Sequence, residues 1–183
     1  MTAIGVVEVL SIPLGVLAGD QMLKTAEVAL VAAQTACAGK YVVVVSGETA
    51  AVQSSVAAGE TAAGAALVDS VLIPNIDERV VAAMGGACDV TDVQAVGVME
   101  TFSLTSAIQA ADAAVKAAAV DLIEVRLGRG LGGKSFLVVT GEVAAVEAAM
   151  QAAEAGAGEE SDRLIAGSVV IPAPHRDIIR ALL

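Results

Sequence analysis

The sequence predicts an α+β protein made of two tandem βαββαβ domains of the ferredoxin-like type. Three observations support this fold class. The first half of the chain returns in the second half, each half alternates valine-rich with alanine-rich runs, and glycine or proline ends most of these runs. Because valine favours strands and alanine favours helices, each half reads as four strands and two main helices.

The repeat is visible as a direct self-alignment. Residues 3–34 match residues 95–126 without a gap, and 11 of these 32 pairs are identical. The match resumes between "GKYVVVVSGETAAV" and "GKSFLVVTGEVAAV", and it closes where "VLIP" pairs with "VVIP". We therefore predict a first domain over residues 1–90 and a second over residues 91–183. The second copy carries two extra residues before its Gly-Lys and four more near "AGEESDRLIAG".

Within the first copy the elements follow in the order β-α-β-β-α-β. "AIGVVEV" predicts a buried strand, residues 15–28 a helix, and residues 28–34 a second strand. "KYVVVVSG" predicts the third strand because β-branched valines favour extended backbone. Residues 48–66 then predict an alanine-rich helix, and "VDSVLIP" a strand that stops at proline. A short helix, "DERVVAAM" or "HRDIIRALL", closes each copy.

Composition narrows the possible functions. The chain has 183 residues, of which 56% are hydrophobic but only 2% aromatic, so alanine and valine dominate and apolar surface remains for other subunits. The net charge of −11 excludes nucleic acid as a partner, because phosphates would repel such a surface. No run reaches the roughly 18 apolar residues that a membrane-spanning helix needs. The start "MTAIGVVEVL" lacks the basic region of a secretion signal, so we expect a cytoplasmic protein whose two cysteines are free thiols.

None of the polar residues forms a catalytic constellation, and no enzyme is predicted. His175 is the only histidine, and no serine or cysteine near it in the sequence forms a nucleophilic pair with it. Glu8 and Glu100 occupy equivalent strand positions, where we expect them to accept hydrogen bonds from local backbone donors. The pairs Asp20–Lys24 and Asp112–Lys116 have the i, i+4 spacing of helical ion pairs. A soluble enzyme on a ferredoxin-like fold is the remaining alternative.

The quoted motifs, present twice in register, resemble the bacterial microcompartment shell domain. Two copies in one chain are similar to the tandem-domain shell proteins, which form trimers that mimic a hexamer. The resemblance implies a homotrimer that assembles with other microcompartment shell proteins and has a central pore. It also implies that Lys24 and Lys116 lie at the edge between oligomers. Ala173 stands where the family has arginine, so these lateral contacts are expected to be weaker or to use groups such as His175.

The loop "TACAGKY" gives the resemblance its sharpest functional implication. Cys37 before Gly-Lys looks most like the propanediol-utilisation tandem shell proteins that carry an iron–sulfur cluster at the pore. There the loop ends in Cys-Pro-Gly-Lys, so alanine at position 38 predicts a looser loop. The resemblance implies that three Cys37 thiolates, one from each chain, hold a shared cluster, most simply a [4Fe–4S] cluster. The alternative is that Cys37 is a small, inert loop residue in a trimer without a cofactor.

The two loops that precede each Gly-Lys are implied to line the pore. The predicted lining residues are Ala36, Ala38 and Gly39 in the first copy and Gly128, Arg129 and Gly130 in the second. If Arg129 lines the opening, three guanidinium groups favour anions there; otherwise Arg129 is a solvated loop residue. Cys88, in "GGACDVTD", is expected to be structural or incidental.

Overall fold

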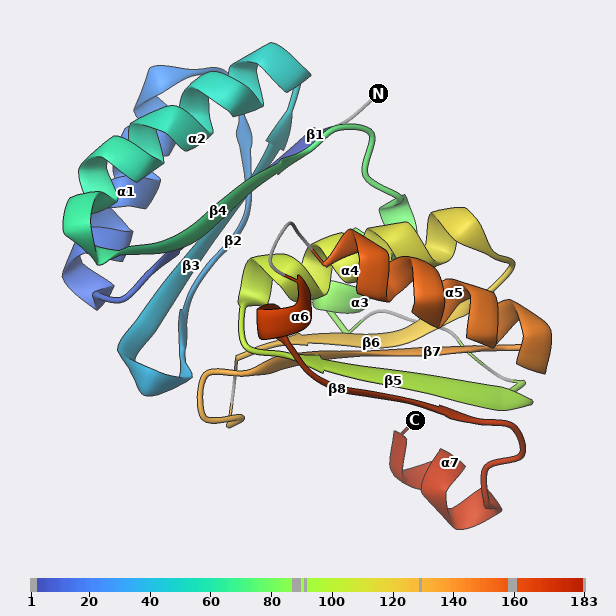
Figure 1. Cartoon of the computed structure of the whole chain (residues 1–183). Coiled ribbons are helices and arrows are strands. Elements are labelled where there is room, and N and C mark those ends of the chain that lie inside the picture. The colour runs from blue at the N-terminus through green and yellow to red at the C-terminus, as the bar shows by residue number, and fades with distance from the viewer. Residues whose placement is uncertain (1–2, 87–89, 91, 129, 158–160, 183) are drawn as a thin grey trace. The chain divides into compact units, whose positions relative to one another are not determined.

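The structure is a computed structural model, shown in Figure 1, and it describes residues 3–86, 90, 92–128, 130–157 and 161–182. Two compact units divide the chain. Unit 1 comprises residues 1–76 together with the short segment Gly128–Gly133, and unit 2 comprises Asp77–Leu127 and Lys134–Leu183. Arg129 and Cys88 lie outside the described residues, so the predictions made for them stay predictions.

Unit 1 contains a four-stranded antiparallel sheet in the order β2-β3-β1-β4, the strand order of a ferredoxin-like fold. The strands are β1 (Ala3–Val9), β2 (Ala29–Ala36), β3 (Lys40–Gly47) and β4 (Leu67–Ile73). The helices α1 (Ile12–Thr25) and α2 (Thr49–Ala63) pack together on one face of this sheet (Figure 1). Single 3₁₀ turns occupy Cys37–Gly39 and Gly64–Ala66.

Unit 2 repeats this architecture with three additions. Its sheet has the order β6-β7-β5-β8, from β5 (Ala95–Thr101), β6 (Asp121–Leu127), β7 (Ser135–Gly141) and β8 (Ile165–Ile171). The helices α4 (Leu104–Ala117) and α5 (Val143–Gly156) correspond to α1 and α2. The additions are α3 (Glu78–Met84), α6 (Ser161–Leu164) and α7 (Arg176–Leu182).

Strand register confirms the internal repeat residue by residue. In unit 1, Gly5 pairs with Val45 on one side and with Leu72 on the other. Its counterpart Gly97 pairs with Val139 and Val170, which are the counterparts of those two residues. Both sheets also shift register at the same place, directly after the glutamates at positions 8 and 100. The two copies therefore share one fold down to its irregularities.

Small residues allow helices and sheets to approach closely, as the alanine- and glycine-rich composition predicts. A Cβ atom added to Gly5 would lie 2.4 Å from Val56 and 2.7 Å from Val52, both in α2. In unit 2 a Cβ on Gly97 would lie 2.6 Å from the sulfur of Met150. A larger side chain at either glycine would therefore force the facing valine or methionine side chains to move.

The ends of some elements differ from the sequence predictions, and the compact units divide the chain at other residues than the sequence copies. The first helix begins and ends three residues earlier than predicted, because Ser11 caps it and Pro13 lies in its first turn. Helix α6 forms among the four extra residues of the second copy, where no element was predicted. The boundary placed between residues 90 and 91 separates the sequence copies, whereas the compact units assign α3 to unit 2 and residues 128–133 to unit 1.

Candidate pore loop and thiolate site

The loop that carries Cys37 is a tight left-handed turn between two strands. Strand β2 ends at Ala36, and β3 begins at Lys40, with a single 3₁₀ turn between them. Ala38 has φ 63° and Gly39 has φ 74°, so two successive residues adopt left-handed backbone. Proline is restricted to a φ near −65° and could not occupy position 38 in this conformation. The alanine there does more than loosen the loop, because it permits a turn that the Cys-Pro-Gly-Lys sequence does not.

Cys37 contacts a glycine-rich segment, Gly128–Gly133. This segment comes from the second sequence copy but belongs to unit 1 in the structure. The Cys37 amide donates to the carbonyl oxygen of Gly128 (2.8 Å), and the Gly130 amide donates to the Cys37 sulfur (2.9 Å). Gly130, Gly132 and Gly133 all have positive φ, which glycine adopts without steric cost. The backbone amides of residues 130–133 therefore face the Cys37 thiol.

These amides favour the thiolate form of Cys37. Hydrogen bonds from the backbone of Gly130, and next of Leu131, lower the pKa of the thiol, and they outweigh partial desolvation, which raises it. Gly132 and Gly133 add smaller contributions of the same sign. The side chain is partly exposed, so the thiolate remains accessible to a ligand. Thiolates, rather than thiols, are nucleophiles and metal ligands.

The donor set fits an iron–sulfur cluster only when several chains contribute. Among the described residues of one chain, no three histidine, cysteine or carboxylate side chains gather into a metal site. Iron–sulfur clusters are held by thiolates whose sulfur atoms accept hydrogen bonds, and Cys37 supplies one such sulfur. The chemistry of this one ligand therefore fits, and the described residues of the same chain supply no further ligands beside it.

Lysines of both Gly-Lys motifs bind the strand glutamates, and these ion pairs were not predicted from the sequence. Lys40 forms an ion pair with Glu8 (2.6 Å) and donates to the carbonyl of Gly133 (3.4 Å). Lys134 pairs with Glu100 (2.9 Å). Glu8 is fully buried, whereas both members of the second pair are more than one third exposed. Both copies contain the lysine of Gly-Lys and the strand glutamate, and this repetition is the feature of the sequence that could have predicted the two ion pairs.

The remaining predicted residues fall into two groups. Ala38, Gly39, Gly128 and Gly130 lie with Cys37 in the loop pair, while Ala36 is only 7% exposed at the end of β2. Lys24, Lys116 and His175 lie at the surface, with 68%, 39% and 75% of their side chains exposed. The predicted pairs Asp20–Lys24 and Asp112–Lys116 are confirmed at 2.7 and 2.5 Å.

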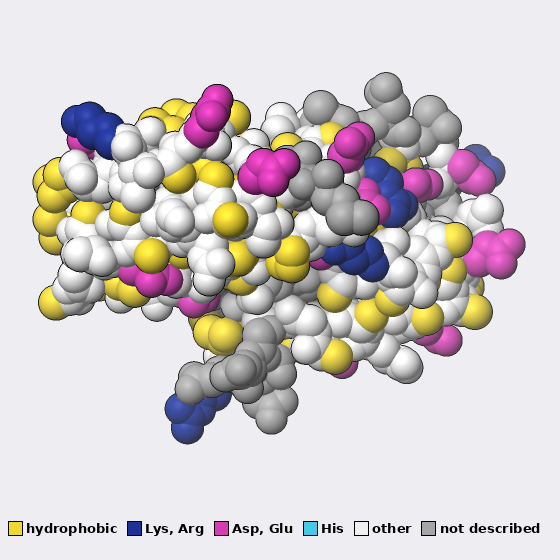
Figure 2. All heavy atoms as spheres, turned by 90° about the horizontal axis from the view of Figure 1, so that it is seen from above, with side chains coloured by type: hydrophobic (Ala, Val, Ile, Leu, Met, Phe, Trp, Pro, Cys, Tyr) yellow, Lys and Arg dark blue, Asp and Glu magenta, His cyan; other side chains and the backbone are white. Residues whose placement is uncertain are grey.

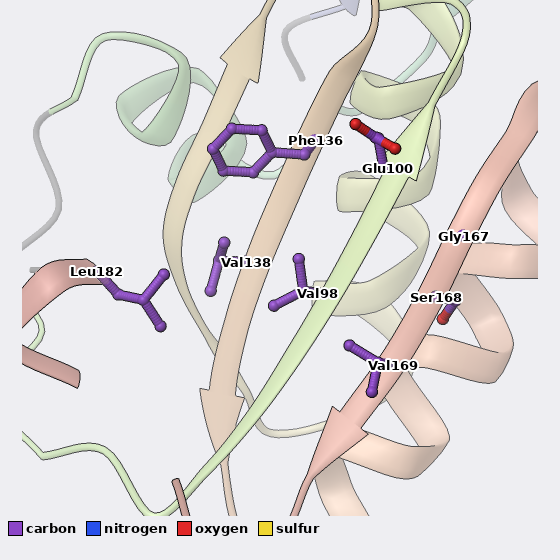
Figure 3. Close-up of a pocket in the computed structure, with 8 residues that line it drawn as sticks. All are labelled: Val98, Glu100, Phe136, Val138, Gly167, Ser168, Val169 and Leu182. Carbon is purple, nitrogen blue, oxygen red and sulfur yellow. The ribbon is translucent and has the colours of Figure 1, made fainter. Parts of the chain in front are cut away.

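An apolar hollow on the sheet of unit 2 was not predicted from the sequence. It has a volume of about 520 Å³ and opens on the sheet face opposite α4 and α5 (Figure 3). Val98, Phe136, Val138 and Val169 project from three neighbouring strands, and Leu182 of α7 faces them. Among the described residues that line the hollow, Glu100 alone is charged. An apolar hollow with one carboxylate suits a protein partner better than a reaction centre.

Comparison with known proteins matches both copies to one family. The BMC domain model matches residues 3–76 and again residues 95–174. The bacterial microcompartment shell protein PduT of Citrobacter freundii is 43% identical over 99% of this chain and 97% of its own length. PduA of the same organism is 41% identical over 49% of this chain and 91% of its own length, which corresponds to a single copy.

A solved structure agrees over the full length. The microcompartment protein from Desulfitobacterium hafniense superimposes with a TM-score of 0.89 and 46% identity, over 98% of this chain and 99% of that one. These relatives are structural proteins, which confirms the prediction that the chain is not an enzyme. In the described part of the chain, no helix combines the length and apolarity needed to cross a bilayer. The chain belongs to the BMC domain family, and it is a tandem-domain microcompartment shell protein with two copies of that domain.

Proposed function

We propose that this shell protein forms a trimer whose central opening holds an iron–sulfur cluster, through which electrons cross the shell of a cytoplasmic microcompartment. One observation carries the proposal: the Cys37 sulfur accepts a backbone hydrogen bond from Gly130, and the pKa of its thiol is lowered. In a trimer, the one Cys37 thiolate of each chain becomes a set of three around the threefold axis.

Three thiolates are one fewer than a cubane cluster usually takes. A [4Fe–4S] cluster held by three Cys37 side chains leaves one iron for water or an outside ligand. When bound, the cluster would supply one-electron transfer. The chain itself contributes the thiolate, the amides that stabilise its charge, and Lys40 near the turn. Lateral assembly with other shell proteins would use the exposed Lys24, Lys116 and His175.

The second candidate is a trimer without a cofactor, whose opening conducts metabolites. The conformation of Ala38 favours it, because the φ of 63° shows a turn different from one built on Cys-Pro-Gly-Lys. In that case the glycine-rich loop would serve as a small, uncharged lining.

Anaerobic purification and reconstitution separate the two candidates. The cluster predicts about four iron and four sulfide per three chains, with a brown colour that Cys37→Ala abolishes and Cys88→Ala retains. Native mass spectrometry in parallel should give the mass of three chains. A colourless reconstituted protein, or iron that persists in the Cys37→Ala variant, refutes the cluster and leaves the metabolite opening.

A further inference from the structure

Helix α3 is held on unit 2 by both apolar and polar contacts. It packs along β6 and beside α4 (Figure 1), where Val80 is fully buried and Ala83 is 1% exposed. The Arg79 guanidinium donates to the carbonyls of Val115 (3.0 Å) and Val120 (2.9 Å) and pairs with Asp77. These two carbonyls lie at the C-terminal end of α4 and in the turn that follows it.

Helix α7 is the counterpart of α3 in the second copy, but none of its residues is buried. The alignment that pairs Pro74 with Pro172 pairs Val80 with Ile178 and Ala83 with Ala181. Ile178 is 52% exposed. The second helix thus keeps the apolar positions of the first, but the described part of the chain leaves them uncovered.

Unit 1 has the matching surface, also uncovered. In unit 2, Val115 and Leu122 are at most 5% exposed, whereas their counterparts Leu23 and Leu30 are 40% and 49% exposed. The turn between helix and strand is the same in both copies. Val28 donates to Ala26 (3.0 Å), as Val120 donates to Ala118 (2.9 Å). The carbonyl acceptors that Arg79 uses in unit 2 therefore have equivalents in unit 1.

The apolar surface extends along the outer face of α1. Leu14, Val16 and Leu17 are each more than one third exposed, and Figure 2 shows hydrophobic side chains at the surface of the part of the molecule that holds unit 1. Unit 2 presents the apolar hollow of Figure 3 next to α7. In unit 1 the counterparts of its lining residues, Val6, Val42 and Val44, are fully buried. An exposed apolar helix and an open apolar sheet face are suitable partners across an interface.

We infer that α7 and the open sheet face of one copy dock on the α1–β2 surface of a second copy, so that α7 does for a neighbouring unit 1 what α3 does for unit 2. Ile178 and Ala181 would pack over Leu23 and Leu30 of the neighbour. The two surfaces differ, so the contact is head-to-tail and closes into a ring by rotation. The inference rests on the trimer proposed above for the number of copies in that ring.

The proposed contact of α7 with a neighbouring chain lacks one feature of the contact that α3 makes with unit 2. Asp177 stands at the position of Arg79 and cannot donate to the two carbonyls. The proposed contact between chains is therefore held mainly by apolar side chains. The ring should dissociate at this contact before α3 separates from unit 2. Replacing this aspartate with arginine should add the missing hydrogen bonds to the carbonyls of Leu23 and Val28 of the neighbour.

The test measures trimer dissociation by analytical ultracentrifugation over a dilution series. Ile178→Glu should raise the concentration of half-dissociation at least about tenfold, since it removes an apolar side chain that the interface would bury and adds a charge there. Arg176→Glu is the matched control on the same helix, because its counterpart Glu78 is exposed, and it should behave like the wild type. Asp177→Arg should lower the concentration of half-dissociation severalfold.

The outcomes separate this inference from the proposed assembly. Circular dichroism should stay unchanged in all three variants, since α7 has no buried residues within the chain. Trimers of wild-type stability in Ile178→Glu overturn the docking while leaving the trimer in place. A wild-type chain that is monomeric at every concentration overturns the trimer and the docking together. Iron content, measured separately, decides the cluster independently of both.

Discussion

Arg79 should be the most sensitive polar residue outside the pore loop. Its guanidinium makes a two-pronged ion pair with Asp77 and donates to two main-chain carbonyls of unit 2. Arg79→Met keeps the length of the side chain but removes all of these donors. The carboxylate of Asp77 then loses the partner that lowers its pKa. The carbonyls of Val115 and Val120 lose the guanidinium that donates hydrogen bonds to them.

The expected cost follows from the bonds that are lost. A hydrogen bond from a charged donor contributes about 1.5–3 kcal/mol when well formed. Because 45% of the Arg79 side chain is exposed, water replaces part of this, and we expect a loss of about 1–3 kcal/mol for the two carbonyl contacts together. The effect should be local, since the buried Val80 and Ala83 still hold α3 by apolar contact.

Hydrogen exchange read by mass spectrometry measures this loss directly. Peptides that cover α3 should exchange about 5- to 150-fold faster in Arg79→Met. This factor is the expected free-energy loss converted into a change of the equilibrium constant for local opening of the helix. Glu78→Gln, at an exposed neighbouring position, should leave the exchange unchanged. Exchange of α3 at the wild-type rate in Arg79→Met would show that the guanidinium contacts contribute nothing to holding the helix.

Three further predictions concern the thiolate and the packing. In a Cys88→Ala background, the pH midpoint of Cys37 alkylation should lie below that of a free cysteine, because backbone amides lower its pKa; an ordinary midpoint would contradict this assignment. Ala38→Pro should shift that midpoint upward, since proline cannot adopt φ 63° and the turn must re-form; an unchanged pH profile would show that the amides do not depend on this turn. Gly5→Ala should destabilise the protein by about 1–3 kcal/mol, because the new Cβ meets Val56 and Val52; unchanged urea denaturation would refute the tight packing.

Most of the fold could be predicted because its signals are local or repeated. Valine runs bounded by glycine mark the central strands, and the repeat lets each copy support the assignment of the other. Element ends are harder to predict than elements. The Ser11 side chain caps the first helix, which the spacing of apolar residues does not reveal, so the helix begins three residues before its predicted start.

The candidate site depends on contacts between distant segments, which a single sequence does not reveal. Nothing in "TACAGK" indicates that Gly130, 93 residues further on, donates to Cys37. The left-handed conformation of Ala38 is equally hidden, since alanine seldom adopts positive φ. Likewise, the sequence assigned α3 to the first copy by position, whereas Val80 and Ala83 bury against the second. Tertiary packing decided each of these points.

The glycine-rich loop of the second copy shows what two non-identical copies in one chain make possible in this shell protein. A ring built from six identical domains would present one loop sequence six times, and any thiol would face five copies of itself. Here one copy supplies Cys37 and the other supplies the Gly130 amide that stabilises its charge. Because both copies lie in one chain, their two loops can have different sequences and complementary roles. One loop supplies the thiolate, and the other supplies the backbone amides that hydrogen-bond to it. Neither copy could therefore be excised or exchanged alone without losing half of that chemistry.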